Sequence, residues 1–398
     1  MNRNRINLLF ILFILSIVRV EAQDELVLDL SKNTIRQKES LYPILDQLQQ
    51  NKSRQISIVH IGDSHIQADF FTGRIREGLQ NQFGDAGRGL IFPYKFVQTN
   101  GPRDYRFTDN SCQWKGMRIM KADSLNPVGI PGIKLELNTA NCGFTIQFYD
   151  DSFSLEKGFS DLDILFEGEA EFEILDLNSR KLFSPQSDSL AGKTRIKNFR
   201  ATRITDLISF RISNAKPGFV LKGLNLHRNS PGVLYHAIGL NGATFNDYLK
   251  SPEFTKELLL LKPELLVVSL GTNESVSAID SATYISQIKQ LLSPFRENGI
   301  PILLTGPADN ARRKTIRTKR GKKIAAYTHN EKVQQLNQWM NSWCAQEGIA
   351  YWDLYETMGG KNSIKEWVKY GLAARDHIHF SKKGYILQAD LLLDAFLH

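Results

Sequence analysis

The stretch Ile56-Ser57-Ile58-Val59-His60-Ile61-Gly62-Asp63-Ser64-His65 decides the fold of this chain. Its first six residues form an apolar run of strand length that is rich in β-branched side chains, and Gly62 ends the run. The residues that follow, Phe70–Phe83, have the apolar spacing of a helix. The stretch therefore predicts a strand, a tight turn and a helix.

The same alternation returns after residue 228. The apolar runs there are nearly continuous, which is typical of parallel strands covered by helices on both faces. We therefore predict an α/β fold with three layers, helix, parallel sheet and helix. The further strands expected are Val233–Ile238, Leu265–Leu270, Ile302–Thr305 and Ile349–Trp352, and the further helices are Glu39–Gln50, one from Ala243, Ser281–Asn298, Thr328–Glu347 and Lys382–Phe396.

Residues 101–228 have a different pattern, with little helical periodicity and short alternating runs separated by turn residues. We interpret them as an all-β sandwich inserted into the α/β domain, because a structureless loop of this length is unusual in a compact chain. The α/β domain then consists of residues 23–100 and 229–398. The runs are Ile133–Asn138, Phe144–Tyr149, Leu162–Phe166, Glu171–Leu175, Leu207–Ile212 and Phe219–Leu226.

Residues 1–22 have the pattern of a secretory signal peptide. A basic start with Arg3 and Arg5 precedes the apolar run Leu8–Val18, and Val20-Glu21-Ala22 provides small residues for cleavage. The run is too short to span a bilayer, although an uncleaved anchor is the alternative. We therefore expect an exported protein, periplasmic or extracellular, with no membrane span in its mature form.

The composition is that of a globular protein, at 42% hydrophobic and 23% charged residues. The formal net charge of +8 would suggest a nucleic-acid partner, but eight basic residues and no acidic one lie within residues 311–323. We interpret this segment as a basic loop, either simply solvated or attracting an anionic polymer. No aromatic residues interleave with its charges, so we expect no nucleic-acid partner.

The chain has three cysteines. Export permits a disulfide, and Cys112 and Cys142 are the only two that are close in sequence. Two buried thiols are the alternative, and the sequence leaves both open.

Polar clusters lie where each of three predicted strands ends, and a fourth precedes the final helix. In an open parallel sheet, ligands bind beyond the carboxyl ends of the strands, so we expect these clusters to meet. They are Gly62-Asp63-Ser64-His65, Gly239–Ala243, Gly271-Thr272-Asn273-Glu274 and Arg375–Phe380.

These clusters contain the parts that a serine nucleophile needs: a base, a group that orients the base, and donors for an oxyanion. Ser64 could attack, His379 could take its proton, and Asp376 could hold the imidazole in the required tautomer. The backbone N–H groups of Ser64 and Gly242 and the side-chain amide of Asn273 could form the oxyanion hole. The alternatives are a helix cap for Ser64 and a turn residue for Asn273.

The neighbours of these residues are expected to have structural roles. We expect Asp63 to brace the turn and Gly239 to serve only its geometry. We expect His65 and His377 to be packing or surface positions, and Glu274 to be a solvated helix start.

The four clusters resemble the conserved blocks of SGNH (GDSL-type) hydrolases and occur in the same order, over about residues 40–95 and 230–398. The blocks are Gly62-Asp63-Ser64, Gly242, Gly271-Thr272-Asn273 and Asp376 with His379-Phe380. The resemblance implies a flavodoxin-like α/β/α fold and a carboxylic ester hydrolase with the triad proposed above.

A narrower resemblance is carried by Gly62–Arg74, which is similar to the first block of bacterial peptidoglycan O-acetylesterases. Those enzymes also carry a carbohydrate-binding-module-like β-sandwich after this block, and Arg375–Phe380 is similar to their last block. The resemblance implies removal of O-acetyl groups from an acetylated glycan of the cell envelope, with peptidoglycan as the expected substrate and without a cofactor.

Three other functions stay open on the sequence. Asp63 and His65 form a D-x-H pair of the kind that dinuclear metallophosphatases use, although the further metal ligands are missing from the pattern. An O-acetyltransferase could use the same triad and pass the acyl group to a sugar. A glycan-binding scaffold could keep the fold without the activity.

Overall fold

The computed structural model describes residues 28–398 except 52, 110, 111, 124, 150–157, 177, 179 and 318–320. The predicted signal peptide, residues 1–22, lies outside the described residues. Within the described part of the chain, no helix has the length and apolar character needed to cross a membrane.

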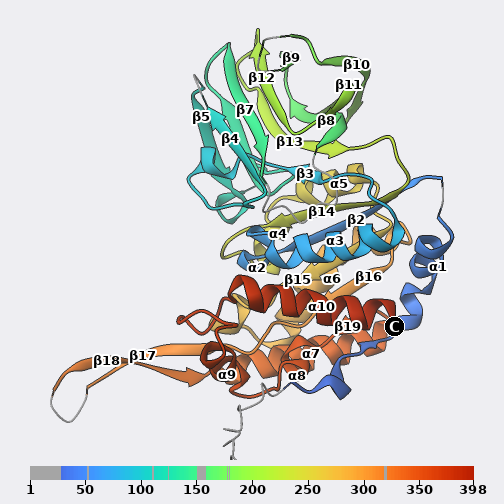
Figure 1. Ribbon diagram of the computed structural model, residues 1–398. Coiled ribbons are helices and arrows are strands. Elements are labelled where there is room, and N and C mark those ends of the chain that lie inside the picture. The colour runs from blue at the N-terminus through green and yellow to red at the C-terminus, as the bar shows by residue number, and fades with distance from the viewer. Residues whose placement is uncertain are drawn as a thin grey trace, which may run out of the picture.

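A six-stranded sheet lies at the centre of the α/β part of the chain (Figure 1). Its order is β1-β19-β16-β15-β2-β14, and every neighbouring pair is parallel except β1 with β19. The strands are β1 Ile35–Arg36, β2 Gln55–Gly62, β14 Gly232–Gly239, β15 Leu265–Ser269, β16 Ile302–Thr305 and β19 Ala350–Trp352.

Alternate residues of the central strands face opposite sides of this sheet, and both sides are covered. In β2, Ile56 and Ile58 join one apolar cluster, while Val59 and Ile61 join the other. The sheet is buried on both faces, which explains why its strands are apolar without interruption. One face carries α1 Tyr42–Gln50, α3 Phe70–Phe83, α8 Leu354–Thr357, α9 Ser363–Lys369 and α10 Lys382–Leu397, and the other α4 Phe245–Leu249, α5 Pro252–Leu258, α6 Ser281–Glu297 and α7 Glu331–Glu347.

Two antiparallel sheets form between the two segments of this fold. One has the path β10-β11-β8-β13-β6-β5, with β3 also paired to β13, and the other has the order β4-β7-β12-β9. Aromatic rings join them, since Phe166 of one lies 4.8 Å from Phe172 of the other, measured between ring centroids. The strands are β3 Gly89–Ile91, β4 Tyr105–Asp109, β5 Trp114–Arg118, β6 Ile133–Leu137, β7 Cys142–Phe148, β8 Phe159–Glu167, β9 Glu171–Leu175, β10 Phe183–Ala191, β11 Thr194–Thr205, β12 Leu207–Ser213 and β13 Val220–His227.

The predicted fold class, a three-layer α/β fold with an all-β insert, is confirmed. The strand β3 differs from the expected organisation, because Gly89–Ile91 lies before residue 101 and yet pairs with β13 of the insert. The strands β4, β5, β10 and β11 were not predicted. In β10 all but the two end residues are exposed, so the apolar alternation that would have revealed this strand is absent.

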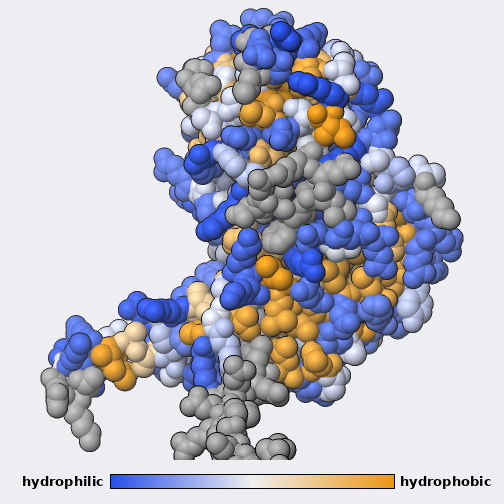
Figure 2. Space-filling model, in the orientation of Figure 1, coloured by the Kyte–Doolittle hydropathy of each residue, from blue (hydrophilic) through white to orange (hydrophobic). Residues whose placement is uncertain are grey.

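The basic segment is a β-hairpin, and its prediction as a loop was wrong. β17 Ala311–Arg317 pairs with β18 Lys323–His329, so that α7 begins at Glu331 rather than at Thr328. Ile316 and Ile324 face each other across the hairpin, and both are exposed. The hairpin projects from the body of the molecule, and its surface is largely hydrophilic with a small apolar area toward the tip (Figures 1 and 2).

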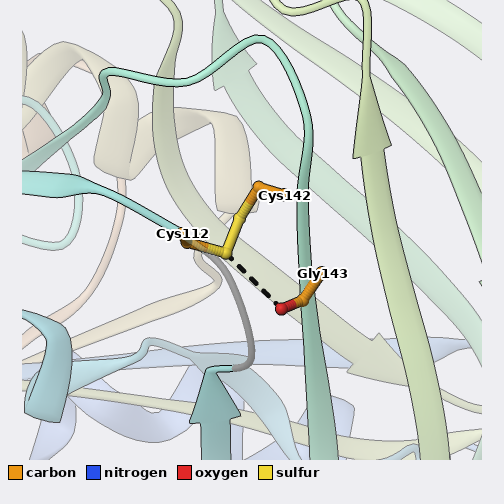
Figure 3. The surroundings of a disulfide bond; sticks show 3 residues. All are labelled: Cys112, Cys142 and Gly143. Carbon is orange, nitrogen blue, oxygen red and sulfur yellow. Dashed lines mark hydrogen bonds between the residues drawn. A yellow bond between two sulfur atoms is a disulfide. The ribbon is translucent and has the colours of Figure 1, made fainter.

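Cys112 and Cys142 form a disulfide that joins the segment before β5 to the first residue of β7 (Figure 3). The Cys112 sulfur also lies 3.5 Å from the carbonyl oxygen of Gly143. The third cysteine, Cys344, is a buried thiol. The bond ties an otherwise irregular segment to the smaller sheet of the insert.

Candidate active site

The turns after β14, β2 and β15 lie side by side because these three strands are neighbours and parallel. Gly62 at the end of β2 is in register with Gly239 of β14 and with Ser269 of β15. The carboxyl ends of all three strands therefore meet at one edge of the sheet. The structure thus brings together the first three polar clusters predicted from the sequence.

The close packing of these turns requires glycine at two positions. A Cβ at Gly62 would lie 2.6 Å from the carbonyl oxygen of Ser269, and a Cβ at Gly239 would lie 2.2 Å from the backbone nitrogen of Gln67. Gly239 is therefore needed for close approach, not only for the turn geometry that we expected of it. The two glycines allow the short helix α2, Ser64–Gln67, to begin directly against the sheet edge.

The Ser64 hydroxyl lies in hydrogen-bond contact with His379. Its Oγ is 2.9 Å from Nε2 of the imidazole, and Nδ1 of the same ring is 2.7 Å from Oδ2 of Asp376. Because a carboxylate can only accept, the proton of the neutral imidazole belongs on Nδ1 and leaves Nε2 free to accept the serine proton. The three residues proposed as a triad, which are 315 positions apart at their ends, thus form one hydrogen-bonded chain.

Asp376 is held by its own backbone loop. Its Oδ1 accepts hydrogen bonds from the backbone N–H groups of Ile378 and His379, at 2.9 and 3.0 Å. Partial burial would raise the pKa of this carboxyl, but the hydrogen bonds from the His379 ring and from the two N–H groups outweigh it and lower the pKa below its ordinary value. Asp376 is therefore a carboxylate in a fixed orientation toward the imidazole.

Asp63 caps α2 and is buried. Its Oδ1 accepts from the backbone N–H of His65 at 3.0 Å, and its Oδ2 accepts from the side-chain amide of Asn273 at 3.3 Å. Burial raises the pKa of Asp63 to about 6, despite the hydrogen bond from His65 and the nearby His379. The residue braces the serine turn, in line with the structural role expected of it.

The two remaining oxyanion candidates, Gly242 and Asn273, lie at this edge and differ in whether their N–H groups already have hydrogen-bond partners. Gly242 has a φ of +83°, and a Cβ there would meet open space, so the glycine is required by its backbone conformation rather than by crowding. Asn273 directs its amide to the carbonyl oxygen of Ala243 at 2.9 Å as well as to Asp63. In the described part of the chain, the N–H groups of Ser64 and Gly242 donate to no protein atom.

His65 packs beneath the proposed base. Its ring is stacked on that of His379, with centroids 5.3 Å apart and planes 29° from parallel, and its Nδ1 is 3.0 Å from the hydroxyl of Tyr385. Burial, helped by the neighbouring His379, lowers the pKa of His65 to about 3, so this ring stays neutral. The packing role expected of His65 therefore places it directly against the proposed triad.

The environment of Glu274 differs from the expected one. Glu274, expected at a solvated helix start, is 1% exposed and accepts a hydrogen bond from the backbone N–H of Phe245 at 2.7 Å. Burial raises its pKa to about 7.

His377 stacks on Tyr327 of the basic hairpin, with centroids 4.0 Å apart, and its carbonyl accepts from the N–H of Ala311 at 3.0 Å. The hairpin base therefore supports the loop that carries Asp376.

The side chain of Gln67 ties the serine turn to its neighbours, a role that the sequence did not reveal. Its Oε1 accepts from the backbone N–H of Asn241 at 2.6 Å, and its Nε2 donates to Thr99 Oγ1 at 3.0 Å and to the carbonyl of Asn100. The amide of Asn241 also donates to the side chain of Asn100. The turn that contains Gly242 is thus fixed relative to Ser64.

The D-x-H pair Asp63 and His65 has other hydrogen-bond partners in this structure. The described residues include no group of three or more His, Cys, Asp and Glu side chains placed to hold a metal ion. The Asp63 oxygens are bonded to protein donors, and the His65 ring is bonded to Tyr385.

Part of the chain matches a known protein family. Residues 214–387 match the model of the GDSL-like lipase/acylhydrolase family, which confirms the resemblance seen in the sequence. The match includes Gly242, Asn273, Asp376 and His379 and begins within the last part of the insert, so it does not reach Ser64. No curated protein sequence matches the chain.

A solved structure shares the fold over most of this chain, and others are similar to a smaller part of it. A structure described as a peptidoglycan O-acetylesterase in action is similar over 89% of this chain and 94% of its own length, with a TM-score of 0.69 and 22% identity. A GDSL-like lipase from Bacteroides thetaiotaomicron matches 41% of this chain and 75% of its own, with a TM-score of 0.32 and 20% identity. An acetylxylan esterase from Geobacillus stearothermophilus matches 42% and 73%, with a TM-score of 0.31 and 14% identity.

Proposed function

We propose that this chain, which carries a GDSL-like lipase/acylhydrolase region, is a serine esterase that removes O-acetyl groups from a polysaccharide of the cell envelope, namely peptidoglycan. The observation that carries the proposal is the hydrogen-bonded chain from the Ser64 hydroxyl through the His379 imidazole to the Asp376 carboxylate. This series of two hydrogen bonds is the arrangement that activates a serine for acyl transfer.

The acylation step uses all three residues. The Ser64 oxygen forms a bond to the acetyl carbonyl carbon while its proton passes to Nε2 of His379. When the tetrahedral intermediate collapses, the bond to the sugar oxygen breaks and His379 returns the proton to that oxygen, so that the sugar leaves as an alcohol. Asp376 stabilises the imidazolium through its 2.7 Å contact with Nδ1.

Deacylation repeats the sequence with water. His379 takes a proton from a water molecule, whose oxygen attacks the acetyl group on Ser64, and then returns the proton to the serine oxygen as acetate is released. No cofactor enters either step.

The negative charge of each tetrahedral intermediate needs donors. The backbone N–H groups of Ser64 and Gly242 supply two of them in this proposal, since neither donates to another described protein atom. Asn273 supplies a third when its amide turns from the 3.3 Å contact with Asp63 toward the oxyanion. The contact that Asn273 keeps with Ala243 would fix the amide during this change.

The extent of the structural similarity supports an acetylated glycan as the substrate. The similarity to the peptidoglycan O-acetylesterase covers 89% of this chain, more than the α/β part alone supplies. The pattern of residues 1–22 supports export to the periplasm or the extracellular space, where such a glycan lies.

The test is acetate release by the purified chain from O-acetylated peptidoglycan, measured beside acetylated xylan and p-nitrophenyl acetate. We expect release from peptidoglycan, and loss of release from all three substrates in Ser64→Ala. Hydrolysis of p-nitrophenyl acetate alone would leave an esterase with another substrate. Transfer of the acetyl group to an added glycan, without free acetate, would identify a transferase instead.

A further inference from the structure

A cavity of about 510 Å³ is lined by the segment after β3, by residues of β4 and by Tyr149, which directly follows β7 of the insert. Its volume is within the range of sites for small organic ligands. Tyr94, Tyr105 and Phe107 line it as buried aromatic side chains, and Tyr149 lines it as a partly exposed one. The cavity therefore offers aromatic surface of the kind that packs against the C–H faces of a sugar ring.

One wall of the cavity is shared with the proposed active site. Asn100, which lines the cavity, accepts hydrogen bonds from the amides of Gln67 and Asn241. Gln67 is three residues after Ser64 in α2, and Asn241 directly precedes Gly242. A ligand against Asn100 is thus separated from the proposed oxyanion turn by a single layer of side chains.

The described charged residues that line the cavity are all cationic. Among the described residues, its charged lining consists of Lys95, Arg103 and Arg106, with no carboxylate. All three are exposed, and none forms an ion pair with a described carboxylate. Arg103 lies over the ring of Phe70, 5.4 Å from its centroid, where a cation–π contact holds the guanidinium on the side of the cavity nearest α3.

The Phe70 ring continues this contact toward the triad. It stacks on Tyr385 at a centroid distance of 6.3 Å, and the Tyr385 hydroxyl is bonded to His65, which packs on His379. Arg103 is therefore linked by four consecutive side-chain contacts to the proposed base. The cavity therefore adjoins the proposed active site through Arg103 as well as through Asn100.

We propose that this cavity binds a carboxylate-bearing part of the glycan substrate, with Arg103, Arg106 and Lys95 contacting the carboxylates and the aromatic side chains contacting sugar. This inference rests on the proposed function and adds a requirement to it: the acetylated polymer must be anionic next to the ester. Guanidinium groups bind carboxylates in bidentate geometry, which makes Arg103 and Arg106 the main contacts.

The first test measures binding without turnover. The Ser64→Ala chain is titrated with soluble O-acetylated peptidoglycan fragments whose carboxylates are free, and with the same fragments after amidation of their carboxylates. We expect the Kd to rise about tenfold or more on amidation, and equally when Lys95→Gln, Arg103→Gln and Arg106→Gln are added to the chain. Arg211→Gln, an exposed cation of β12 outside the cavity, is the matched control and should leave the Kd unchanged.

The second test measures turnover with Ser64 in place. The triple substitution should raise the KM for the peptidoglycan fragments about tenfold and leave kcat/KM for p-nitrophenyl acetate and for neutral acetylated xylan oligosaccharides unchanged. If the triple variant folds poorly, Arg106→Gln alone, at an exposed position of β4, should still raise the KM severalfold.

The outcomes separate the two claims. Fragments that bind in the expected charge-dependent way but release no acetate would contradict the proposed function and support the cavity. Acetate release with a KM that ignores both amidation and the triple substitution would overturn the cavity as a carboxylate site and leave the esterase intact.

Discussion

The Asp376 carboxylate accepts three hydrogen bonds, two from the backbone of its own loop and one from the His379 ring. The side chains of Asp376 and His379 are 48% and 42% exposed, so their orientation depends on these contacts rather than on burial. A short loop can hold an exposed pair in this way because the bonds are local and charge-assisted. The proposed base is therefore oriented by contacts within its own loop.

Replacing this carboxylate tests its role. In Asp376→Asn, the amide can donate to Nδ1 and would favour the tautomer with its proton on Nε2, which cannot accept from Ser64. We expect kcat on p-nitrophenyl acetate to fall about 10³-fold or more, with little change in Tm. Asp390→Asn, which changes an equally exposed carboxylate of α10, should retain activity. Equal activities in the two variants would remove Asp376 from the mechanism.

Glu274 gives a prediction about stability and pH. Burial raises its pKa to about 7 from an ordinary 4.5, so between these values the folded protein keeps a proton that the unfolded chain has released. The free energy of unfolding should therefore fall as pH rises through this window, by about 1–3 kcal/mol from this residue.

The comparison is between wild type and Glu274→Gln, which mimics the protonated side chain and should flatten this part of the pH dependence. Denaturant unfolding at pH 5 and pH 8 measures it. Asp63, with a pKa raised to about 6 by burial, adds a decrease of the same sign in both proteins. Equal decreases in the two proteins would show that Glu274 does not carry the effect.

The sequence could predict Ser64 because polar residues directly after an apolar strand are unusual. It could predict His379 and Asp376 because their cluster before the final helix completes the order of the four blocks. Gln67 and Asn100 could not be found in this way. Their contacts join segments whose spatial relation depends on where the insert begins, and no local pattern encodes it. Glu274 was misjudged because helix starts are commonly acidic and solvated, whereas this one is covered by α4.

At the scale of elements, most strands with an alternating or continuous apolar pattern were predicted, whereas the mostly exposed strands were not. β12 alternates buried residues with more exposed ones and β8 is mostly buried, whereas β10 and the hairpin β17–β18 are mostly exposed. Hydrophobic burial produces the pattern that sequence reasoning detects. A hairpin stabilised by backbone pairing and rich in cations lacks it.

The disulfide of the insert gives a prediction at this scale. It closes a loop of 30 residues, and the chain-entropy model assigns such a loop about 3–4 kcal/mol of stabilisation. We expect reduction, or Cys112→Ser with Cys142→Ser, to lower the Tm while p-nitrophenyl acetate turnover stays within twofold. A reducing agent should have no further effect on the double variant. An unchanged Tm would indicate that the bond contributes nothing to the folded insert.

At the scale of the whole molecule, a buried ionic network connects α3 with the strands of the insert. Arg76 and Arg88 both contact Asp69, at 2.8 and 2.7 Å, and Arg88 also contacts Asp104, which directly precedes β4. All four side chains are buried. Because buried charges are costly when unpaired, this network makes the placement of the insert on the α/β fold dependent on specific partners.

Removing one member of this network should therefore strongly decrease the free energy of unfolding. In Arg88→Met, Asp104 loses its close partner, and we expect the free energy of unfolding to decrease by about 3–5 kcal/mol. Arg195→Met, which breaks an exposed pair with Asp188, should change it by less than about 1 kcal/mol. Chemical denaturation of both variants gives the comparison, and similar effects in the two would mean that the network is not a stabilising connection.

The proposed nucleophile is the Oγ atom of Ser64, and covalent labelling of this atom tests the proposal. Treating the chain with a fluorophosphonate and mapping the adduct by peptide mass spectrometry should give a single adduct on Ser64. The adduct should be absent in Ser64→Ala and should form much more slowly in His379→Ala, because the imidazole 2.9 Å away would no longer accept the proton. An unlabelled Ser64, or an adduct on a different serine while ester hydrolysis continues, would contradict the account.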